Sequence, residues 1–342
     1  MYSFNPDSIN IFYQHDLNRS MISSENFSNK KTNRMEYAIE LIGVSKVYYG
    51  NKRQEQKTAL DTLNLRIPKG SIFGLLGPNG AGKSTMINIV AGLTNKTNGS
   101  VVVWGCDQDR EPERSRSFLG VVPQELNLDP FLSPYDSLEI QAGLFGVPRR
   151  ERKTLEILEK VGLGDVMHSY ARALSGGMRR RLLMAKALVH NPPILILDEP
   201  TAGVDINLRE MLWDYVKELS KLGTTIILTT HYLEEAQNIC NKIGILNNGI
   251  LVEHGETEAL LAKVHNKVLI IHPREAIKKI PTFPPAVKVL LRSNGSLELS
   301  FDRSVITAVE LITLFKQADI SIKDIETSEP ILEDVFRVAT SE

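Results

Sequence analysis

Several features are scarce or missing in this sequence of 342 residues, and each absence excludes a class of protein. The two cysteines, Cys106 and Cys240, are too few for a disulfide framework or a cysteine-based metal cluster, so two reduced thiols are expected. No apolar run approaches the roughly 20 residues that a membrane-spanning helix needs. No signal peptide is visible at the N-terminus. The sequence therefore does not favour a disulfide-rich secreted protein or an integral membrane protein.

The charges and the overall composition narrow the choice further. The 40 Lys and Arg residues are balanced by 41 Asp and Glu residues, which leaves a formal net charge of −1. This balance provides no polycationic surface for a phosphate backbone, so no nucleic-acid partner is expected. Hydrophobic residues make up 42% and charged residues 24% of the chain, as in ordinary globular proteins. The length is sufficient for about two domains.

The glycine-rich stretch 77–85, with the sequence GPNGAGKST, is the most informative part of the chain. It matches the pattern G-x-x-x-x-G-K-[ST] of a phosphate-binding loop. The apolar residues 71–76 before it predict a short buried strand, and residues 85–90 after it predict the start of a helix, which is the context that the pattern requires. In such a loop, backbone N–H groups surround a phosphate, Lys83 adds a full charge, and the Ser84 hydroxyl can ligate Mg²⁺.

Two acidic residues follow a second predicted strand. Residues 194–197 form a continuous apolar run, which is typical of a strand buried on both faces of a parallel sheet, and the run leads into Asp198 and Glu199. Because ligands of open α/β sheets bind at the carboxyl ends of strands, we expect both acids at the nucleotide. Asp198 suits Mg²⁺, and Glu199 suits the attacking water as a general base or an orienting group. Helix capping is the structural alternative, but the nearby phosphate loop favours the functional interpretation.

Further polar residues occupy comparable positions. Gln124 ends a predicted strand over residues 119–124, and His231 follows a predicted strand over residues 224–230, from where it could reach a γ-phosphate. The sequence LSGGM at residues 174–178 opens a long helix and predicts a second anion-binding helix N-terminus. We expect the three arginines at 179–181 to be solvated within that helix.

Composition and periodicity divide the chain into three parts. Residues 1–34 are rich in Asn and Ser without a sustained period, so we expect them to be disordered and dispensable for catalysis, with Met35 as an alternative start of translation. Residues 35–265 form the predicted nucleotide-binding domain, with a helical subdomain at about 125–190. In this subdomain, the basic stretch 149–153 is expected to be a solvated helix start. Residues 266–342 predict a small α+β accessory domain without obvious chemistry, ending in a helix over residues 331–338.

Taken together, these stretches make residues 36–261 resemble the nucleotide-binding subunit of ABC transporters. GPNGAGKST resembles Walker A, LSGGM resembles the ABC signature, and ILILDEP at 194–200 resembles Walker B with its catalytic glutamate. Finer stretches, including GGMRRRL, PTAGVD and TTHYLEEA, resemble the ATPases of ABC-2-type exporters, which include drug, polysaccharide and nodulation-factor export systems. The resemblance implies an α/β P-loop NTPase fold with a mostly parallel core sheet, an antiparallel β subdomain and an α-helical subdomain.

The resemblance also implies roles for individual residues, with ATP and Mg²⁺ as cofactors. Lys83, Glu199 and His231 are expected to be catalytic, His231 as the switch histidine. Ser84, Gln124 and Asp198 are the expected metal ligands, and Gln124 resembles the Q-loop glutamine that senses the membrane partner. The expected nucleotide contacts are Tyr48, Gly77, Pro78, Asn79, Gly80, Ala81, Gly82, Lys83, Ser84, Thr85, Gln124, Ser175, Gly176, Gly177 and Asp205. Tyr48 is expected to stack on the adenine ring, with Tyr49 as the alternative.

Two partners follow from the same resemblance. In this family the signature of one subunit closes over the Walker A nucleotide of another, so a chain with each motif once implies a head-to-tail homodimer with two equivalent ATP sites. The second partner is a separate transmembrane permease, whose short coupling helix would enter an apolar groove formed by residues 124–146. The apolar residues expected to share core and groove are Leu126, Leu128, Phe131, Leu132, Tyr135, Leu138, Ile140, Leu144 and Phe145. This partner would hold the chain at the cytoplasmic face of the inner membrane.

The leading functional hypothesis is thus an ATPase that powers export of an unspecified substrate through that permease. Two alternatives stay open at this point. A soluble ABC-type ATPase acting on ribosomes or DNA would usually carry two cassettes or a long coiled-coil insertion, and neither is present. An importer ATPase with a regulatory C-terminal domain is disfavoured by the ending at 329–336, which resembles that of exporter ATPases.

Overall fold

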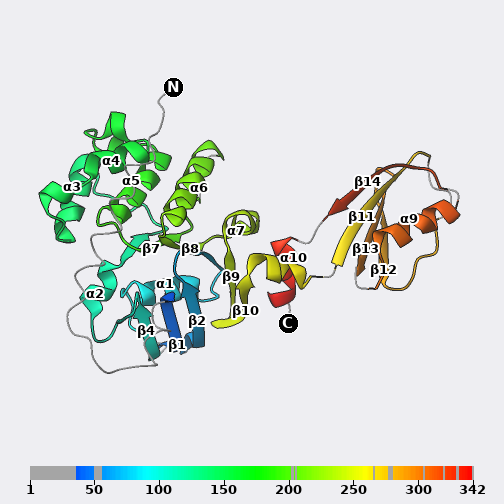
Figure 1. Cartoon of the computed structure of the whole chain (residues 1–342), viewed down its shortest axis with the longest axis horizontal. Helices are drawn as coiled ribbons and strands as arrows, with labels where there is room; N and C mark the ends of the chain where they lie inside the picture. Colours follow the sequence, from blue (N-terminus) through cyan, green and yellow to red (C-terminus); the bar gives the residue numbers. More distant parts are fainter. Residues whose placement is uncertain are drawn as a thin grey trace. The chain divides into compact units, whose positions relative to one another are not determined.

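The computed structural model describes residues 36–49, 56–201, 204, 206–264, 266–275, 280–302, 305–318, 320–328 and 331–340 (Figure 1). The predictions for residues 1–34, for Met35 and for Asp205 therefore lie outside the described residues. Three β-sheets are present in the described part of the chain.

A six-stranded sheet with the order β10-β9-β3-β8-β7-β6 forms the centre of the nucleotide-binding domain. Its strands are β3 (Ile72–Leu76), β6 (Leu119–Val122), β7 (Ile194–Asp198), β8 (Thr225–Thr229), β9 (Lys242–Asn247) and β10 (Ile250–Glu256). Neighbours from β6 to β9 pair in parallel, and β10 pairs antiparallel with β9. Every residue of β3 and β8 is buried, as expected for parallel strands covered on both faces. The mostly parallel core sheet predicted from the sequence is confirmed.

The turn between β9 and β10 is a tight hairpin. Asn248 has a φ of 48° and Gly249 a φ of 81°. Two successive residues with positive φ are what a two-residue type I′ turn needs, and the sequence Asn-Gly favours that conformation.

Side chains alternate between two apolar layers on the faces of the central sheet. Ile72 and Leu76 belong to one buried cluster, which includes residues of α5 (Gly176–Leu188), α6 (Ile206–Lys221), α7 (Leu233–Ile239) and α8 (Thr257–Ala262). Phe73 and Leu75 belong to a second cluster with residues of α1 (Lys83–Val90) and of the antiparallel sheet. This alternation follows from the period of two in a β-strand.

The antiparallel sheet has the order β2-β1-β4-β5. Its strands are β1 (Tyr37–Tyr48), β2 (Lys57–Pro68), β4 (Asn98–Val103) and β5 (Cys106–Asp107), and the short helix α2 (Pro112–Ser117) follows β5. This sheet is the antiparallel subdomain that the resemblance predicts.

The helical subdomain contains α3 (Pro134–Leu144), α4 (Thr154–Lys160) and α5, joined through the short 3-10 turns η3 (Arg149–Glu151), η4 (Gly164–Val166) and η5 (Ala171–Ala173). Leu138, Leu158 and Leu182 belong to its own buried cluster. The prediction for the basic stretch 149–153 is wrong in part, because α4 begins only at Thr154 and Arg152 is not solvated. The Arg152 guanidinium Nη1 lies 2.7 Å from Glu139 Oε2 and is mostly buried.

The C-terminal sheet is antiparallel, with the order β12-β13-β11-β14. It consists of β11 (Asn266–Pro273), β12 (Val287–Leu291), β13 (Leu297–Asp302) and β14 (Ile322–Ser328), and it shares a buried cluster with α9 (Ala308–Gln317). The last helix, α10 (Leu332–Thr340), differs from the sequence-based expectation. Its Leu332 and Val335 join the cluster of the nucleotide-binding domain rather than that of the C-terminal sheet, and the Leu332 N–H donates to Gln237 Oε1 at 2.7 Å.

Candidate nucleotide site

The predicted phosphate loop connects β3 to α1, and its backbone can be built only with glycine at two points. Gly77 has a φ of +155°, and a Cβ on it would lie 2.3 Å from the carbonyl oxygen of Leu246. Gly82, the N-cap of α1, has a φ of +110°, and its Cβ would lie 2.6 Å from the carbonyl oxygen of Ala59. The first turn of α1 contains no acidic residue, so the positive end of the helix dipole is not neutralised locally.

Lys83 lies against this loop. Its Nζ donates to the carbonyl oxygen of Gly77 at 2.6 Å and to that of Pro78 at 3.1 Å. Burial lowers the pKa of Lys83, while the charges of Glu199 and Asp198 oppose this shift. A phosphate oxygen is a stronger acceptor for an ammonium group than a neutral carbonyl, so the lysine is positioned to exchange these contacts for an anion.

Thr229, at the end of β8, positions both acids at the end of β7. Asp198 pairs with Thr229 in the parallel register, and its Oδ1 accepts a hydrogen bond from Thr229 Oγ1 at 2.5 Å. The backbone N–H of Glu199 donates to Thr229 Oγ1 at 3.0 Å and lies 3.1 Å from the Thr229 carbonyl oxygen. Sequence analysis did not identify this residue. Thr229 could have been found from its position at the carboxyl end of a predicted buried strand, which is the position that Asp198 has on its own strand.

The side chain of Glu199 is the meeting point of three strand ends. Gln124, just beyond β6, donates through Nε2 to Glu199 Oε2 at 3.0 Å. His231, just beyond β8, places Nδ1 at 3.5 Å from the same oxygen, and its ring packs on Tyr232 with centroids 3.9 Å apart. Half of the His231 side chain is exposed, whereas Glu199 is largely buried. Glu199 has a φ of 47°, a conformation uncommon for a residue with a side chain and frequent at functional sites.

The three arginines after the LSGGM sequence are not solvated, so that expectation is wrong. Arg180 is only 6% exposed, and its Nη1 donates to the carbonyl oxygens of Pro123 at 3.1 Å and Gln124 at 2.9 Å. Arg179 donates to the carbonyl oxygens of Ala171 and Arg172, at 3.2 and 2.9 Å. Arg181 donates through Nη1 to the backbone carbonyl oxygens of Val161 and Gly162. Each guanidinium group thus joins α5 to backbone that precedes it in the sequence.

Other predicted site residues are not joined to this cluster by side-chain contacts. Tyr48 is exposed, and Lys46 Nζ lies 4.7 Å from its ring centroid, so its adenine contact stays a prediction, as does that of Tyr49. Ser175 caps α5, because its Oγ accepts a hydrogen bond from the Met178 N–H at 3.2 Å. Ser175 and Gly176 are exposed.

Comparison with known proteins identifies the family to which this site belongs. A family profile described as "ABC transporter" matches residues 60–202. The linearmycin resistance ATP-binding protein LnrL of Bacillus subtilis is 34% identical over 295 residues, which are 83% of this chain and 94% of LnrL. This chain belongs to the ABC transporter family. The predicted family and its P-loop fold are therefore confirmed, and the chain is an ABC-type ATP hydrolase.

Further relatives of this ABC ATPase are ATP-binding proteins of resistance and export systems. The daunorubicin/doxorubicin resistance ATP-binding protein DrrA of Streptomyces peucetius is 37% identical, with 70% of this chain and 71% of DrrA covered. The Nod factor export ATP-binding protein I of Cupriavidus pinatubonensis is 39% identical, with 61% of this chain and 65% of that protein covered. The Nod factor export ATP-binding protein is named for export, which is the function of the group that the sequence favoured.

Solved structures agree with the fold. An ATP-binding subunit of an ABC transporter superposes with a TM-score of 0.60 at 26% identity, covering 66% of this chain and 92% of that one. A dimeric ATP-binding cassette in a post-hydrolysis state, bound to ADP and Pi, superposes with a TM-score of 0.58 at 30% identity, covering 64% of this chain and 98% of that one. ABC cassettes of this type thus form dimers. Within the described ranges of our chain, no helix is both long and apolar enough to span a bilayer.

Proposed function

We propose that this ABC ATPase hydrolyses ATP to drive the export of a substrate through a separate membrane subunit. The observation that carries this proposal is the convergence of Gln124 and His231 on one carboxylate oxygen of Glu199, beside a phosphate loop that presents Lys83. The direction of transport is supported by the relatives, whose names describe drug resistance and Nod factor export.

The chemistry assigns a distinct role to each residue of this cluster. As a water oxygen attacks the γ-phosphorus, the bond to the oxygen shared with the β-phosphate breaks and ADP leaves. Glu199 is placed to accept the proton of that water, or to orient it, and Gln124 and His231 fix the carboxylate. Lys83 and the loop N–H groups bind the phosphate oxygens, on which negative charge is concentrated.

The oxygen donors at the site fit Mg²⁺. Ser84 is exposed beside Lys83, Asp198 has one carboxylate oxygen oriented by Thr229, and Gln124 uses its amide N–H toward Glu199, so its amide oxygen is the remaining donor. Across the described residues, no group of three or more His, Cys, Asp and Glu side chains could hold a metal by itself. This suits Mg²⁺, which is usually bound by one or two protein ligands together with phosphates and water, and which neutralises phosphate charge when bound.

The dimer proposed for the active state is head-to-tail. Ser175 and Gly176 are exposed at the start of α5, where a second copy could bring its nucleotide. The N-terminal end of α5 offers free N–H groups to that anion. The dimeric cassette with bound ADP and Pi supports a dimer as the catalytic unit.

The membrane subunit would dock on an apolar surface of α3 and its surroundings, which we call the docking surface: Phe131, Ile140, Leu144 and Leu155. Their exposed fractions are 66%, 49%, 78% and 55%, whereas Leu138 on the same helix is fully buried. Of the predicted groove residues, Leu138 therefore serves the core alone. Ile140 and Leu144 lie one turn apart on α3, and exposed large apolar side chains on one face are typical of an interaction site.

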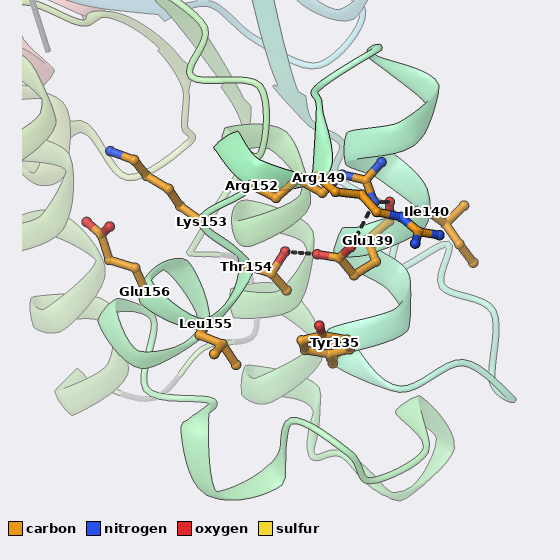
Figure 2. A pocket seen from close by; sticks show the side chains of 9 residues that line it. All are labelled: Tyr135, Glu139, Ile140, Arg149, Arg152, Lys153, Thr154, Leu155 and Glu156. Atoms are coloured by element: carbon orange, nitrogen blue, oxygen red, sulfur yellow. Dashed lines mark hydrogen bonds and ion pairs between the residues drawn. The ribbon is translucent and has the colours of Figure 1, made fainter.

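A pocket of about 780 Å³ adjoins the docking surface and contains Ile140 and Leu155 (Figure 2). Figure 2 shows Glu139 bonded to both Thr154 and Arg152, which join α3 to the start of α4. The Thr154 hydroxyl and the Arg152 guanidinium hold the pKa of Glu139 below its usual value. These bonds tie the start of α4 to α3, so a coupling helix of the membrane subunit would meet a pocket lined by both apolar and charged side chains.

The double substitution Ile140→Glu and Leu144→Glu tests this proposal. We expect the variant to move from the membrane fraction to the soluble fraction of cells that contain the membrane subunit, because charged side chains cannot be buried against an apolar coupling helix. ATP binding by the purified variant should stay within about threefold of wild type, because both side chains are exposed and their replacement disturbs no core packing.

The matched control is Val309→Glu, which replaces an equally exposed apolar side chain on α9. It should leave fractionation unchanged. Membrane retention of the double variant, or equal retention of wild type in cells with and without the membrane subunit, would contradict the docking model.

A further inference from the structure

Arg180 is the feature of the site that the proposed chemistry leaves unused. It is a cation in α5 and is 6% exposed, and charged side chains are rarely buried so deeply without a partner. Among the described residues, its hydrogen bonds go to two neutral carbonyl oxygens, those of Pro123 and Gln124, and not to a carboxylate. Burial lowers the pKa of Arg180, and the nearby charges of Glu199 and Asp198 act in the opposite direction.

Arg180 is linked to the proposed catalytic carboxylate of Glu199 through a single residue, Gln124. Gln124 receives Arg180 through its backbone carbonyl and contacts Glu199 Oε2 through its side-chain Nε2. β6 ends at Val122, so no sheet hydrogen bond of this strand fixes the backbone of Pro123 and Gln124. The hydrogen bonds from Arg180 hold this backbone segment where the sheet has ended.

We infer that Arg180 is a positioning residue that holds Gln124 beside Glu199 and thereby transmits the position of α5 to the catalytic carboxylate. α5 begins at Gly176, directly after Ser175, so a displacement of the exposed signature end displaces the Gln124 backbone through one guanidinium group. A guanidinium group suits this role because its planar, fixed set of donors lets a single Nη1 reach both carbonyls. The inference rests on the proposed ATP hydrolysis.

The test is the steady-state turnover of ATP by the full chain carrying Arg180→Met. We expect kcat to fall about tenfold or more, as misplacing a positioned group by a fraction of an ångström does, with the affinity for a fluorescent ATP analogue within threefold of wild type. The fold should survive, because Pro123 and Gln124 are exposed and water can satisfy the two carbonyls. The melting temperature checks this, and Arg180→Lys, which retains a positively charged N–H donor group, should recover part of the lost kcat.

Two comparisons make the result decisive. If Arg180 acts through Gln124, the double variant Arg180→Met with Gln124→Ala should turn over ATP within about twofold of Gln124→Ala alone, since the two residues then share one effect. Arg179→Met is the matched control, because Arg179 also bonds two backbone carbonyls but only within the helical subdomain. It should leave kcat within twofold of wild type.

Multiplicative losses in the double variant, or a normal kcat in Arg180→Met, would overturn the inference while leaving the ATPase assignment intact. A wild-type chain that does not hydrolyse ATP would instead refute the proposed function.

Discussion

Lys83→Ala is expected to lower the affinity for ATP about 100-fold and to reduce hydrolysis below detection. Charge-assisted hydrogen bonds to a buried or half-buried phosphate are each worth about 1.5–3 kcal/mol, and 1.4 kcal/mol corresponds to tenfold in affinity. Hydrolysis should fall further than binding, because the lysine also stabilises the charge on the γ-phosphoryl group in the transition state. Titration of the purified variant with a fluorescent ATP analogue, followed by an assay of phosphate release, measures both effects.

Local structure should tolerate this change. Lys83 contacts two backbone carbonyls of its own loop, and among the described residues it forms no side-chain ion pair that the substitution would break. Lys263→Ala removes an exposed ion pair with Glu253 and serves as the control for loss of a lysine elsewhere on the surface. Turnover within a few-fold of wild type in Lys83→Ala would contradict the assignment of the loop as the nucleotide site.

Glu199→Gln is expected to lower kcat about 1000-fold while ATP affinity stays within about threefold, since loss of a general base typically costs 10²–10⁴ in rate. The amide has the same shape as the carboxylate, and its oxygen can still accept the hydrogen bond from Gln124 Nε2. It lacks the negative charge that draws the proton from water. A site that binds ATP without consuming it should also accumulate an ATP-dependent dimer, which light scattering detects.

Glu125→Gln is the matched control for this substitution. The chemical change is identical, and Glu125 is adjacent to Gln124 in the sequence. The Glu125 carboxylate, however, accepts a hydrogen bond from Asn127 Nδ2 at 3.2 Å. Its turnover should equal that of wild type. Normal turnover in Glu199→Gln would show that another carboxylate activates water, and Asp198 would be the next candidate.

The separation between binding and chemistry in these variants also distinguishes the roles of the two sides of the site. The phosphate loop stabilises both the bound ground state and the transition state, so a substitution in the loop lowers both the affinity for ATP and kcat. The cluster around Glu199 acts on the attacking water, which reacts only in the chemical step. A variant series that fails to show this separation would place Glu199 in nucleotide binding.

The sequence alone was sufficient for the features that depend on contiguous residues. The phosphate loop needs glycine at positions whose backbone excludes a Cβ, and the spacing of GPNGAGKST expresses that requirement directly. The run at 194–197 predicted a buried parallel strand, and the hairpin at Asn248-Gly249 likewise follows from residues that favour positive φ, because each is decided by local conformation and burial. The family and the α/β fold followed from the order of these local patterns.

The tertiary structure decided which distant residues meet. Gln124 and Glu199 are 75 positions apart, and they share a hydrogen bond only because β6 and β7 are neighbours in the sheet. The sequence predicted a helix over residues 331–338 as part of the C-terminal domain, but not that Leu332 and Val335 pack on the nucleotide-binding domain. Amphipathic spacing specifies that a face is buried, and several apolar surfaces of one chain can satisfy it equally.

Arg180 shows most clearly why part of the site was not predictable. Its neighbours one and two turns later on α5, Met184 and Ala187, are buried, so helical spacing placed Arg180 on the inner face. Its charge nevertheless favoured an exposed position, because burial of an arginine is unfavourable unless hydrogen-bond acceptors are present at the buried site. Those acceptors are backbone carbonyls 56 and 57 positions away, and backbone carbonyls leave no mark in an amino-acid sequence. Only the packing of α5 beside the end of β6 brings them within reach of the guanidinium group.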